Sequence, residues 1–259
     1  MRTAATSASA LAAALACSVA MGCGASARSV APYAVERRCA VEERLVLADD
    51  LSLACIAPGV WVYTALAGAD FSLPRYPANG LVLESADHAT LIDSAWSSAQ
   101  TARLIDWSRS RGRPITAAIA THFHDDRVAG APALRAARIP FYATAETIAL
   151  ARSHGAAVPD RALEPASVPE VRWLFPGAGH APDNIVVWHA PTRTLFGGCL
   201  VKDLAATALG NLSDADVARW PAALDRVRAT FGDPARVVPG HGAVGGTELL
   251  DHTRDLLAE

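Results

Sequence analysis

Residues 119–130 read Ile-Ala-Thr-His-Phe-His-Asp-Asp-Arg-Val-Ala-Gly, and we expect the rest of the chain to be organised around this stretch. A short apolar strand is predicted just before it, so His122, His124 and Asp126 take alternate positions and face one side of the chain. Two imidazoles and a carboxylate are ligands that suit zinc. The spacing therefore predicts a metal site, and a polar loop lined by the same residues is the alternative.

The composition predicts a folded chain without a nucleic-acid partner. Of the 259 residues, 51% are hydrophobic, which is ample for a substantial core. The formal net charge is −3 and the charged residues are scattered, so the basic surface of a nucleic-acid-binding protein is not expected. Basic residues are almost all arginine, because Lys202 is the only lysine.

An export signal is predicted at the N-terminus. Arg2 precedes an apolar run, rich in alanine and leucine, that ends near Met21 and is too short for a comfortable membrane span. Ala25-Ser26-Ala27 then fits the small-x-small rule of signal peptidase. We therefore predict a signal peptide at 1–27 and a soluble periplasmic domain at 28–259.

The cysteines leave two questions open. Residues 20–23, Ala-Met-Gly-Cys, loosely resemble a lipobox, so lipidation of Cys23 and an outer-membrane anchor is the alternative to a soluble protein. An oxidising periplasm would permit Cys39 and Cys55 to pair, whereas two free buried thiols would be the other possibility. Cys199 has no obvious partner.

The order of predicted strands and helices indicates α/β layers. Strands are predicted at 59–65, 80–84, 89–93, 115–121, around 141, at 170–175, 184–189, 192–196 and 235–238. Helices are predicted at 98–111, 128–138, 145–154, 214–231 and 247–257. The remaining assignments are a polar linker at 28–45, a mobile hairpin or flap at 66–79 and a loop at 156–168. His88 is expected in a solvated turn, and His154 is expected at a helix end as a cap or surface residue.

Further metal-type ligands follow other predicted strands. His180, Cys199 and His241 each lie beside glycines, which permit the sharp turns that converging loops need. A catalytic zinc takes three protein ligands and keeps one position for water. Together with the ligands of the opening stretch, these residues suit two such sites.

Ordered motifs then identify a family. They are Tyr-Pro-Ala-Asn-Gly (76–80), Leu-Ile-Asp-Ser-Ala-Trp (91–96), Thr-His-Phe-His-Asp-Asp-Arg-Val-Ala-Gly (121–130), Pro-Gly-Ala-Gly-His (176–180), Asp-Asn (183–184), Gly-Gly-Cys (197–199), Gly-Asn-Leu-Ser-Asp-Ala-Asp (210–216) and Val-Pro-Gly-His-Gly (238–242). From about Gly59 onward the chain resembles the class B metallo-β-lactamases, in the subclass with three histidines at one zinc and Asp-Cys-His at the other. The resemblance is strongest to the Verona-type carbapenemases. It implies an αββα four-layer sandwich and zinc-dependent hydrolysis of penicillins, cephalosporins and carbapenems, which confers antibiotic resistance.

The resemblance also implies a role for each site residue. His122, His124 and His180 would hold the first of two zinc ions, and Asp126, Cys199 and His241 the second. Asp126 would also orient the attacking water, Lys202 would bind the substrate carboxylate, and Asn211 would position or polarise the lactam carbonyl. Trp61, Phe71 and Trp96 are candidates for apolar walls, the two tryptophans also for plain core, and Asp93 for support of the metal loop or of a buried turn. The implied partner is a small β-lactam, with no protein partner and a monomeric chain.

Some positions depart from the Verona-type pattern, and other functions stay open. The segment 159–170 looks shorter, those relatives generally lack a lysine at the position of Lys202, and the flap sequence 66–72 differs. Superfamily branches that hydrolyse thioesters, lactones or phosphodiesters usually have histidine where this chain has Arg127 and aspartate where it has Cys199. An exported zinc-binding protein without turnover is the alternative from another class.

Overall fold

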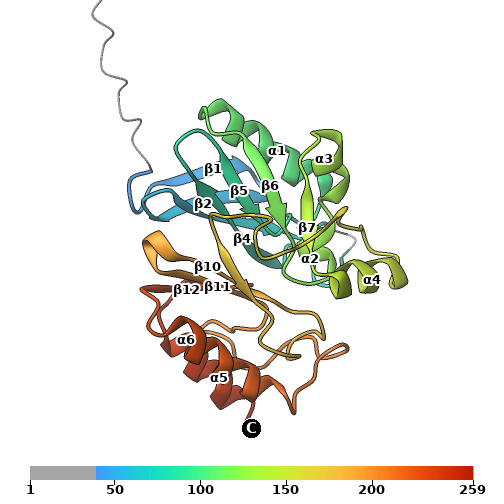
Figure 1. The fold of residues 1–259 in the computed structure, drawn as a ribbon, viewed down its shortest axis with the longest axis vertical. Helices are drawn as coiled ribbons and strands as arrows, with labels where there is room; N and C mark the ends of the chain where they lie inside the picture. Colours follow the sequence, from blue (N-terminus) through green and yellow to red (C-terminus); the bar gives the residue numbers. More distant parts are fainter. Residues whose placement is uncertain (1–38, 70, 259) are drawn as a thin grey trace, which may run out of the picture. The chain divides into compact units, whose positions relative to one another are not determined.

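The computed structural model describes residues 39–69 and 71–258, and the predicted signal peptide with Cys23 lies outside them. Two sheets form the centre of this part of the chain (Figure 1). The first sheet contains, in spatial order, β1 (Arg44–Ala48), β2 (Leu51–Ala57), β3 (Val60–Leu66), β4 (Pro77–Glu84), β5 (Ala89–Ile92), β6 (Ile115–Ile119), β7 (Phe141–Ala143) and β8 (Arg161–Ala162). The second contains β12 (Arg236–Pro239), β11 (Thr194–Gly198), β10 (Val186–His189) and β9 (Arg172–Leu174).

Helices pack around the two sheets. They are α1 (Ser98–Ser110), α2 (Asp125–Val128), α3 (Ala131–Ala136), α4 (Ala145–Ser153), α5 (Trp220–Phe231) and α6 (Glu248–Leu256), with a 3₁₀ turn at Ala190–Thr192. Figure 1 shows α1 and α3 on one side of the paired sheets and α5 and α6 on the other. The layers are therefore helix, sheet, sheet and helix, which confirms the predicted αββα sandwich.

Three apolar clusters join these four layers. One lies between the first sheet and its helices and includes Trp61 and Leu104, which are both fully buried. A second, with Ile119 and Phe196, packs the two sheets together. The third holds α5 and α6 against the second sheet and is centred on buried Trp220. Burial of this apolar surface is the main driving force that fixes where the strand-end loops meet.

Parallel pairing brings the functional loops to one edge. β5, β6, β7 and β8 pair in parallel, and so do β11 and β12, whereas the other neighbouring strands are antiparallel. The carboxyl ends of parallel strands point to the same edge of a sheet, where α/β enzymes build their sites. Asn79 in β4 links the sheets near that edge, because its side-chain amide donates to the Pro239 carbonyl at 3.1 Å.

The structure corrects several predicted boundaries. The linker prediction for 28–45 is wrong at its end, because β1 already begins at Arg44 and forms a hairpin with β2 that was not predicted. The helix predicted at 128–138 begins earlier and is interrupted at Gly130. The helix predicted at 214–231 begins only at Trp220, with Pro221 in its first turn. The loop predicted at 156–168 contains the short edge strand β8.

Cys39 and Cys55 form a disulfide bond, which decides between the two alternatives left open by the sequence. Cys55 belongs to β2, so the bond ties the start of the described chain to the first sheet. Cys199 is the free cysteine of the described residues, and it is buried.

His88 lies in the predicted turn between β4 and β5, but it is not fully solvated. Its Nδ1 lies 2.8 Å from Asp87 Oδ1 and its Nε2 lies 2.9 Å from Glu170 Oε1, and the side chain is 29% exposed. Glu170 precedes β9 of the other sheet, so this contact joins the two halves of the sandwich. The hydrogen bonds to Asp87 and Glu170 raise the pKa of His88 above its ordinary value.

We expect His88→Gln to destabilise the protein under mildly acidic conditions only. Because the folded pKa is raised, the contribution of His88 is fully present below the unfolded value of about 6.5 and is lost as the pH rises through the folded pKa. Urea unfolding of the metal-free protein should show a loss of less than about 1 kcal/mol at about pH 5.5 and no resolved loss at about pH 9. A loss that is equal at both pH values would contradict the ionic role.

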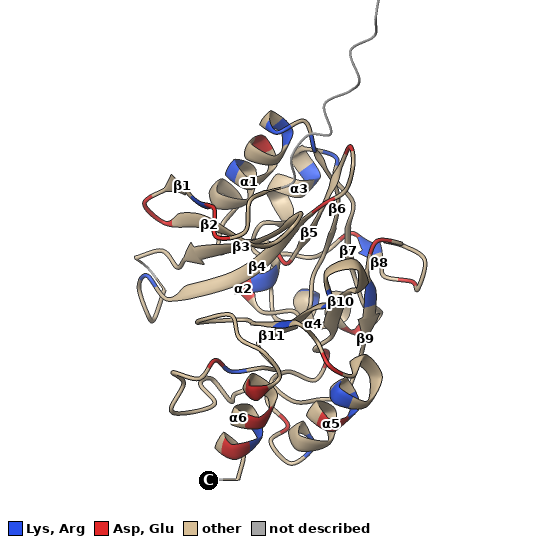
Figure 2. Ribbon diagram, turned by 90° about the vertical axis from the view of Figure 1, so that its left-hand side faces the viewer, with Lys and Arg blue, Asp and Glu red and all other residues tan. Residues whose placement is uncertain are grey.

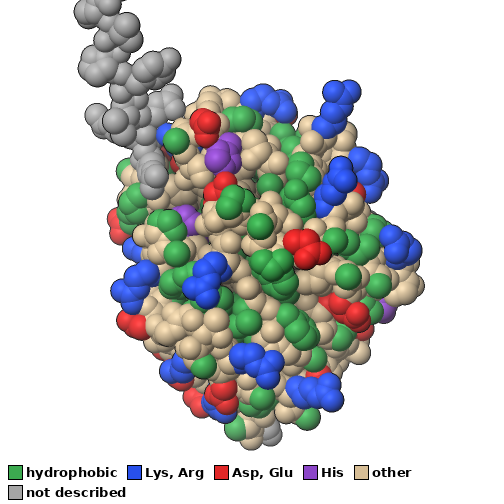
Figure 3. All heavy atoms as spheres, in the orientation of Figure 1, with side chains coloured by type: hydrophobic (Ala, Val, Ile, Leu, Met, Phe, Trp, Pro, Cys, Tyr) green, Lys and Arg blue, Asp and Glu red, His purple; other side chains and the backbone are tan. Residues whose placement is uncertain are grey.

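Charged residues lie mainly on the outer helices and the loops, and the strands are largely free of them (Figure 2). Positive and negative side chains are interspersed with apolar ones over the face in Figure 3. A face on which charges of both signs are mixed in this way produces little long-range field. Among the described residues, every helix is too short or too polar to cross a bilayer.

Candidate metal centre

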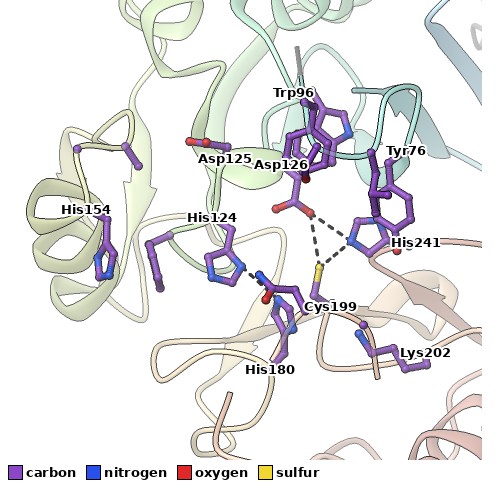
Figure 4. A pocket seen from close by; sticks show the side chains of 18 residues that line it. Tyr76, Trp96, His124, Asp125, Asp126, His154, His180, Cys199, Lys202 and His241 are labelled. Atoms are coloured by element: carbon purple, nitrogen blue, oxygen red, sulfur yellow. Dashed lines mark hydrogen bonds and ion pairs between the residues drawn. The ribbon is translucent and has the colours of Figure 1, made fainter. Parts of the chain in front are cut away.

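The candidate ligands of the sequence analysis lie together in the structure. His122 and His124 follow β6, Asp126 lies in α2, and Cys199 directly follows β11. His180 lies in the loop between β9 and β10, and His241 lies just after β12. Figure 4 shows the labelled members of this set pointing toward a common centre from separate loops.

Three imidazoles converge on one point. His124 Nδ1 lies 3.1 Å from His122 Nε2 and 3.2 Å from His180 Nε2. In a tetrahedral zinc site with bonds of about 2.0–2.1 Å, two nitrogen ligands are about 3.3 Å apart. The spacing of these nitrogens therefore fits a single zinc ion without a large movement of the chain.

A carboxylate, a thiol and an imidazole form a second group. Cys199 Sγ lies 3.6 Å from Asp126 Oδ2 and 3.2 Å from His241 Nε2, and these two last atoms are 3.3 Å apart. Zinc bonds of about 2.3 Å to sulfur and about 2.0–2.2 Å to nitrogen or oxygen give ligand separations of about 3.3–3.6 Å. The second group therefore also fits zinc, and its anionic ligands make it the more negative of the two.

The two groups are immediate neighbours. Candidate ligand sets drawn from both of them, such as His122, His180 and Cys199 or His122, His124 and Asp126, have ligand atoms within 4.8 Å of one another. Two metal ions bound here could therefore contact one substrate at the same time.

A comparison with known families agrees with this geometry. Residues 73–241 match the model of the Metallo-beta-lactamase superfamily. The chain belongs to this superfamily. It is 36% identical over 222 residues to "Metallo-beta-lactamase type 2" of Bacteroides fragilis, which covers 83% of this chain and 89% of that protein. It is 38% identical over 213 residues to "Metallo-beta-lactamase type 2" of Bacillus cereus, with 80% and 82% covered.

Solved structures of metallo-β-lactamases have the same fold. The mono-zinc form of the metallo-β-lactamase FIM-1 from Pseudomonas aeruginosa has a TM-score of 0.77 and 34% identity, with 82% of this chain and 98% of that chain covered. A metallo-β-lactamase from Erythrobacter litoralis has a TM-score of 0.78 and 29% identity, with 83% and 99% covered. These similarities confirm the family and the fold class that the motifs implied.

Burial favours the neutral, metal-binding form of two histidines in this metallo-β-lactamase site. It lowers the pKa of His122 and that of His180 well below the ordinary value, and neighbouring side chains, His124 for the former and Lys202 for the latter, lower them further. Both rings are therefore neutral at physiological pH and can offer a nitrogen lone pair.

His241 and Asp126 shift each other's pKa. Burial alone would lower the pKa of His241, but Cys199 and Asp126 outweigh it and raise the pKa to about 9. Burial alone would raise the pKa of Asp126, but Arg127 and His241 hold it well below its usual range. Without metal, a proton on His241 thus balances the negative ligands, and zinc binding would release it.

Arg127 supports the second ligand group from beneath. Its guanidinium is fully buried and lies 2.7 Å from Asp126 Oδ2, 2.9 Å from Cys199 Sγ and 3.2 Å from Asp93 Oδ2. Two acidic groups and a sulfur therefore share one permanent cation. From the sequence, Arg127 served only to separate related families, so this role was missed.

Arg127 also binds backbone carbonyls of two distant segments. It donates to the carbonyl of Asn79 at 2.6 Å and to that of Gly240 at 3.0 Å. Only glycine fits at 240, because a Cβ there would lie 2.7 Å from Cys199 Sγ and 2.8 Å from Arg127 Nη2. The close approach of the His241 loop to the second group thus depends on this glycine.

Asp93 supports the metal loop, as one of its two predicted roles requires. Its carboxylate accepts hydrogen bonds from Thr121 N at 2.7 Å and from Thr121 Oγ1 at 2.9 Å. Burial raises the pKa of Asp93 to about 7, although Arg127 opposes the shift. Asp93 adopts a left-handed conformation with φ of 61°, which also places it in a tight buried turn.

In His241 and His124, the ring nitrogen that faces away from the ligand groups has a partner of its own, which orients the imidazole. His241 Nδ1 donates to the Pro77 carbonyl at 2.5 Å, so its Nε2 faces the second group. His124 Nε2 lies 3.1 Å from Asp214 Oδ2, so its Nδ1 faces the other histidines. Such contacts fix the ring orientation of a metal ligand. Asp214 lies within the motif at 210–216, but its contact with His124 is visible only in the folded structure.

The ligand groups lie at the floor of a groove of about 590 Å³ (Figure 4). Phe71 and Trp96 line it with ring centroids 4.5 Å apart, so they form the predicted apolar wall. Trp61 is instead fully buried core. Tyr76, a lining residue that was not predicted, packs on His241 with centroids 4.8 Å apart.

Lys202 and Asn211 also line the groove. Lys202 Nζ lies 5.4 Å from the centroid of the Trp220 ring, and burial lowers the pKa of Lys202. Asn211 Oδ1 accepts a hydrogen bond from Ser213 N at 3.1 Å, so local turn geometry engages the oxygen and leaves the NH₂ group as a donor. His154 ends α4 as predicted, but it also lines the groove.

Proposed function

We infer that this chain is a zinc-dependent metallo-β-lactamase that hydrolyses the amide bond of penicillins, cephalosporins and carbapenems and so confers resistance. The observation that carries this inference is the pair of adjacent ligand groups at the floor of a groove that also contains Lys202. A metal-binding protein without turnover would need neither an open groove nor a cation beside the metal groups.

We assign two zinc ions to the chain. His122, His124 and His180 hold the first, and Asp126, Cys199 and His241 hold the second. The separations of the ligand atoms support this division, because each set has the spacing of a tetrahedral zinc site.

Zinc, when bound, supplies Lewis-acid stabilisation of negative charge and lowers the pKa of bound water to about 7. The side chains around the metal groups orient the water and the substrate. Asp126 orients the attacking water. Its Oδ2 lies 3.6 Å from Cys199 Sγ and 3.3 Å from His241 Nε2, and Arg127 keeps the side chain ionised as a carboxylate. No serine nucleophile is needed for this reaction.

Lys202 and Asn211 position the substrate. The ammonium of Lys202 pairs with the carboxylate that most β-lactam drugs carry, and the Asn211 NH₂ donates to the lactam carbonyl oxygen. Phe71 and Trp96 pack against apolar parts of the drug and exclude water from that side.

Lys202→Ala is expected to raise KM by about 10-fold or more, since it removes a charge-assisted hydrogen bond to the substrate carboxylate. Steady-state kinetics with a cephalosporin should show a smaller change in kcat than in KM. Lys202→Arg is the matched control, because it keeps the cation and should retain much of the affinity. An unchanged KM in the alanine variant would remove the proposed role.

A panel of substrates from different chemical classes tests which bond the protein hydrolyses. Purified zinc-loaded protein is offered a penicillin, a cephalosporin and a carbapenem beside a thioester, a lactone and a phosphodiester. We expect opening of the three β-lactams and no comparable turnover of the others. Efficient turnover of the thioester, lactone or phosphodiester with inert β-lactams would favour the alternative branches of the superfamily.

We further propose cleavage after Ala27 and a soluble, monomeric protein in the periplasm. The N-terminal pattern supports export, and all the ligands come from one chain. Cell fractionation of the wild type and of Cys23→Ala tests this placement. Membrane association that disappears in Cys23→Ala would instead show a lipid anchor, and light scattering after size exclusion gives the oligomeric state.

A further inference from the structure

The groove has opposite chemical character at its two ends. Among the described residues that line it, Lys202 is the only lysine or arginine. Figure 4 shows Lys202 on one side of the ligand groups and Asp125 and His154 on the other. A substrate that spans the groove therefore meets a cation at one end and hydrogen-bond acceptors at the other.

Asp125 supplies a free carboxylate at the second end. It is the first residue of α2 and lies between the two ligands His124 and Asp126. Because those ligands face inward, Asp125 is turned to the rim, where it is exposed and lines the groove. Its carboxylate has no hydrogen-bond or ion-pair partner among the described residues, so it is available to a bound molecule.

His154 supplies a second acceptor there. Its Nδ1 lies 3.0 Å from the Leu150 carbonyl, which can only accept, so the ring tautomer that fits this contact carries its proton on Nδ1. Nε2 is then left with a lone pair. The ring also packs on buried Phe123 with centroids 4.6 Å apart, which fixes its position at the rim.

The chemistry of β-lactams matches this polarity. The ring carboxylate and the acylamino side chain are attached at opposite ends of the fused bicycle, with the reacting carbonyl between them. A carboxylate held by Lys202 and a carbonyl above the metal groups therefore direct the acylamino side chain toward Asp125 and His154. A positive, donor-bearing side chain is the complementary one.

We propose that Asp125 and His154 form an acceptor rim that recognises a protonated amino group on the acylamino side chain, so that zwitterionic β-lactams are preferred substrates. This inference rests on the proposed function and names a substrate class for the same site. Because the rim is solvent-exposed, the preference is modest, about two- to five-fold in kcat/KM.

The test compares two penicillins that differ only in an α-amino group on a phenylacetyl side chain, namely benzylpenicillin and its aminobenzyl analogue. The assay uses the zinc-loaded enzyme at about pH 7, where an α-amino group is mostly protonated. The readout is the ratio of kcat/KM for the amino compound to that for the other. The wild-type ratio should be about two to five and should fall as salt is added.

Variants then locate the source of the preference. Asp125→Asn should bring the ratio close to one, and His154→Phe, which keeps an aromatic ring on Phe123, should lower it. Asp106→Asn, with its side chain 73% exposed on α1, is the matched control and should keep the wild-type ratio. The change should lie mainly in KM.

The possible outcomes distinguish a failure of the acceptor rim from a failure of the proposed function. A wild-type ratio of one or less, or an unchanged ratio in Asp125→Asn, would overturn the acceptor rim. Equal losses for both penicillins in Asp125→Asn would also overturn it, because they would indicate a structural role. A wild-type enzyme that hydrolyses neither penicillin would instead refute the proposed function.

Discussion

Arg127→Ala is expected to destabilise the metal-free protein by about 3–5 kcal/mol, the usual cost of removing one partner of a buried ion pair. The guanidinium is fully buried, and it is the cation that Asp126 and Asp93 share. Without it both carboxylates would remain in a low-dielectric interior, and the carbonyls of Asn79 and Gly240 would each lose one donor. Urea unfolding followed by fluorescence measures the loss.

Two variants make this result specific. Arg109→Ala removes an arginine whose side chain is 62% exposed and pairs with Asp106 on the surface of α1, so it should cost less than about 1 kcal/mol. Arg127→Lys keeps the charge but cannot reach all the acceptors at once, so its loss should lie between those of the wild type and Arg127→Ala. Equal stability of Arg127→Ala and Arg109→Ala would contradict the central role of the guanidinium.

Cys199→Ser is expected to empty the second zinc site while the first stays occupied. The thiolate is the softest ligand of its group, and an alcohol is a poor replacement for it. Affinity at the second site should fall by about 100-fold or more, since even outer partners of a metal ligand are worth 10–100-fold. Hydrolysis should fall with it.

Metal counting gives the readout for Cys199→Ser. Zinc content after dialysis should drop from about two per chain toward one, and the cobalt-substituted protein should lose its sulfur-to-metal charge-transfer band. His124→Asn is the matched variant for the first site and should leave that band in place. Equal loss of metal at both sites in Cys199→Ser would contradict the division of the ligands.

The sequence was sufficient to propose the candidate ligands, because the motifs that contain them are local. His122, His124 and Asp126 lie within one short stretch, and His180, Cys199 and His241 each follow a strand end beside glycines. The structure brings all of them together. The four-layer fold was also predictable, because the family resemblance implied it, and the alternation of strands and helices independently indicated α/β layers.

Contacts across the fold could not be predicted in the same way. Arg127 reaches segments far away in the chain, and only tertiary structure shows that they meet around it. The contact of His124 with Asp214 and the place of His154 at the groove have the same cause.

Two of the incorrect predictions, the missed strand β2 and the early start of α5, could have been avoided from local sequence patterns. β2 alternates between fully and partly buried residues, the period of a strand, and Leu51-Ser-Leu-Ala-Cys-Ile-Ala shows that alternation. Pro221 favours the first turn of a helix, which places the start of α5 later than predicted. His88 was misjudged because the partner that shields it, Glu170, comes from the other sheet.

We propose that the protein opens β-lactams with two zinc ions held by these ligands. The most direct measurement is the rate of β-lactam opening by the metal-free chain as zinc is added, followed by addition of a chelator. We predict that activity toward a penicillin, a cephalosporin and a carbapenem appears with bound zinc, reaches its maximum near two ions per chain and disappears with the chelator. Failure of the fully zinc-loaded protein to open any of the three, or activity that is the same without zinc, would contradict the account.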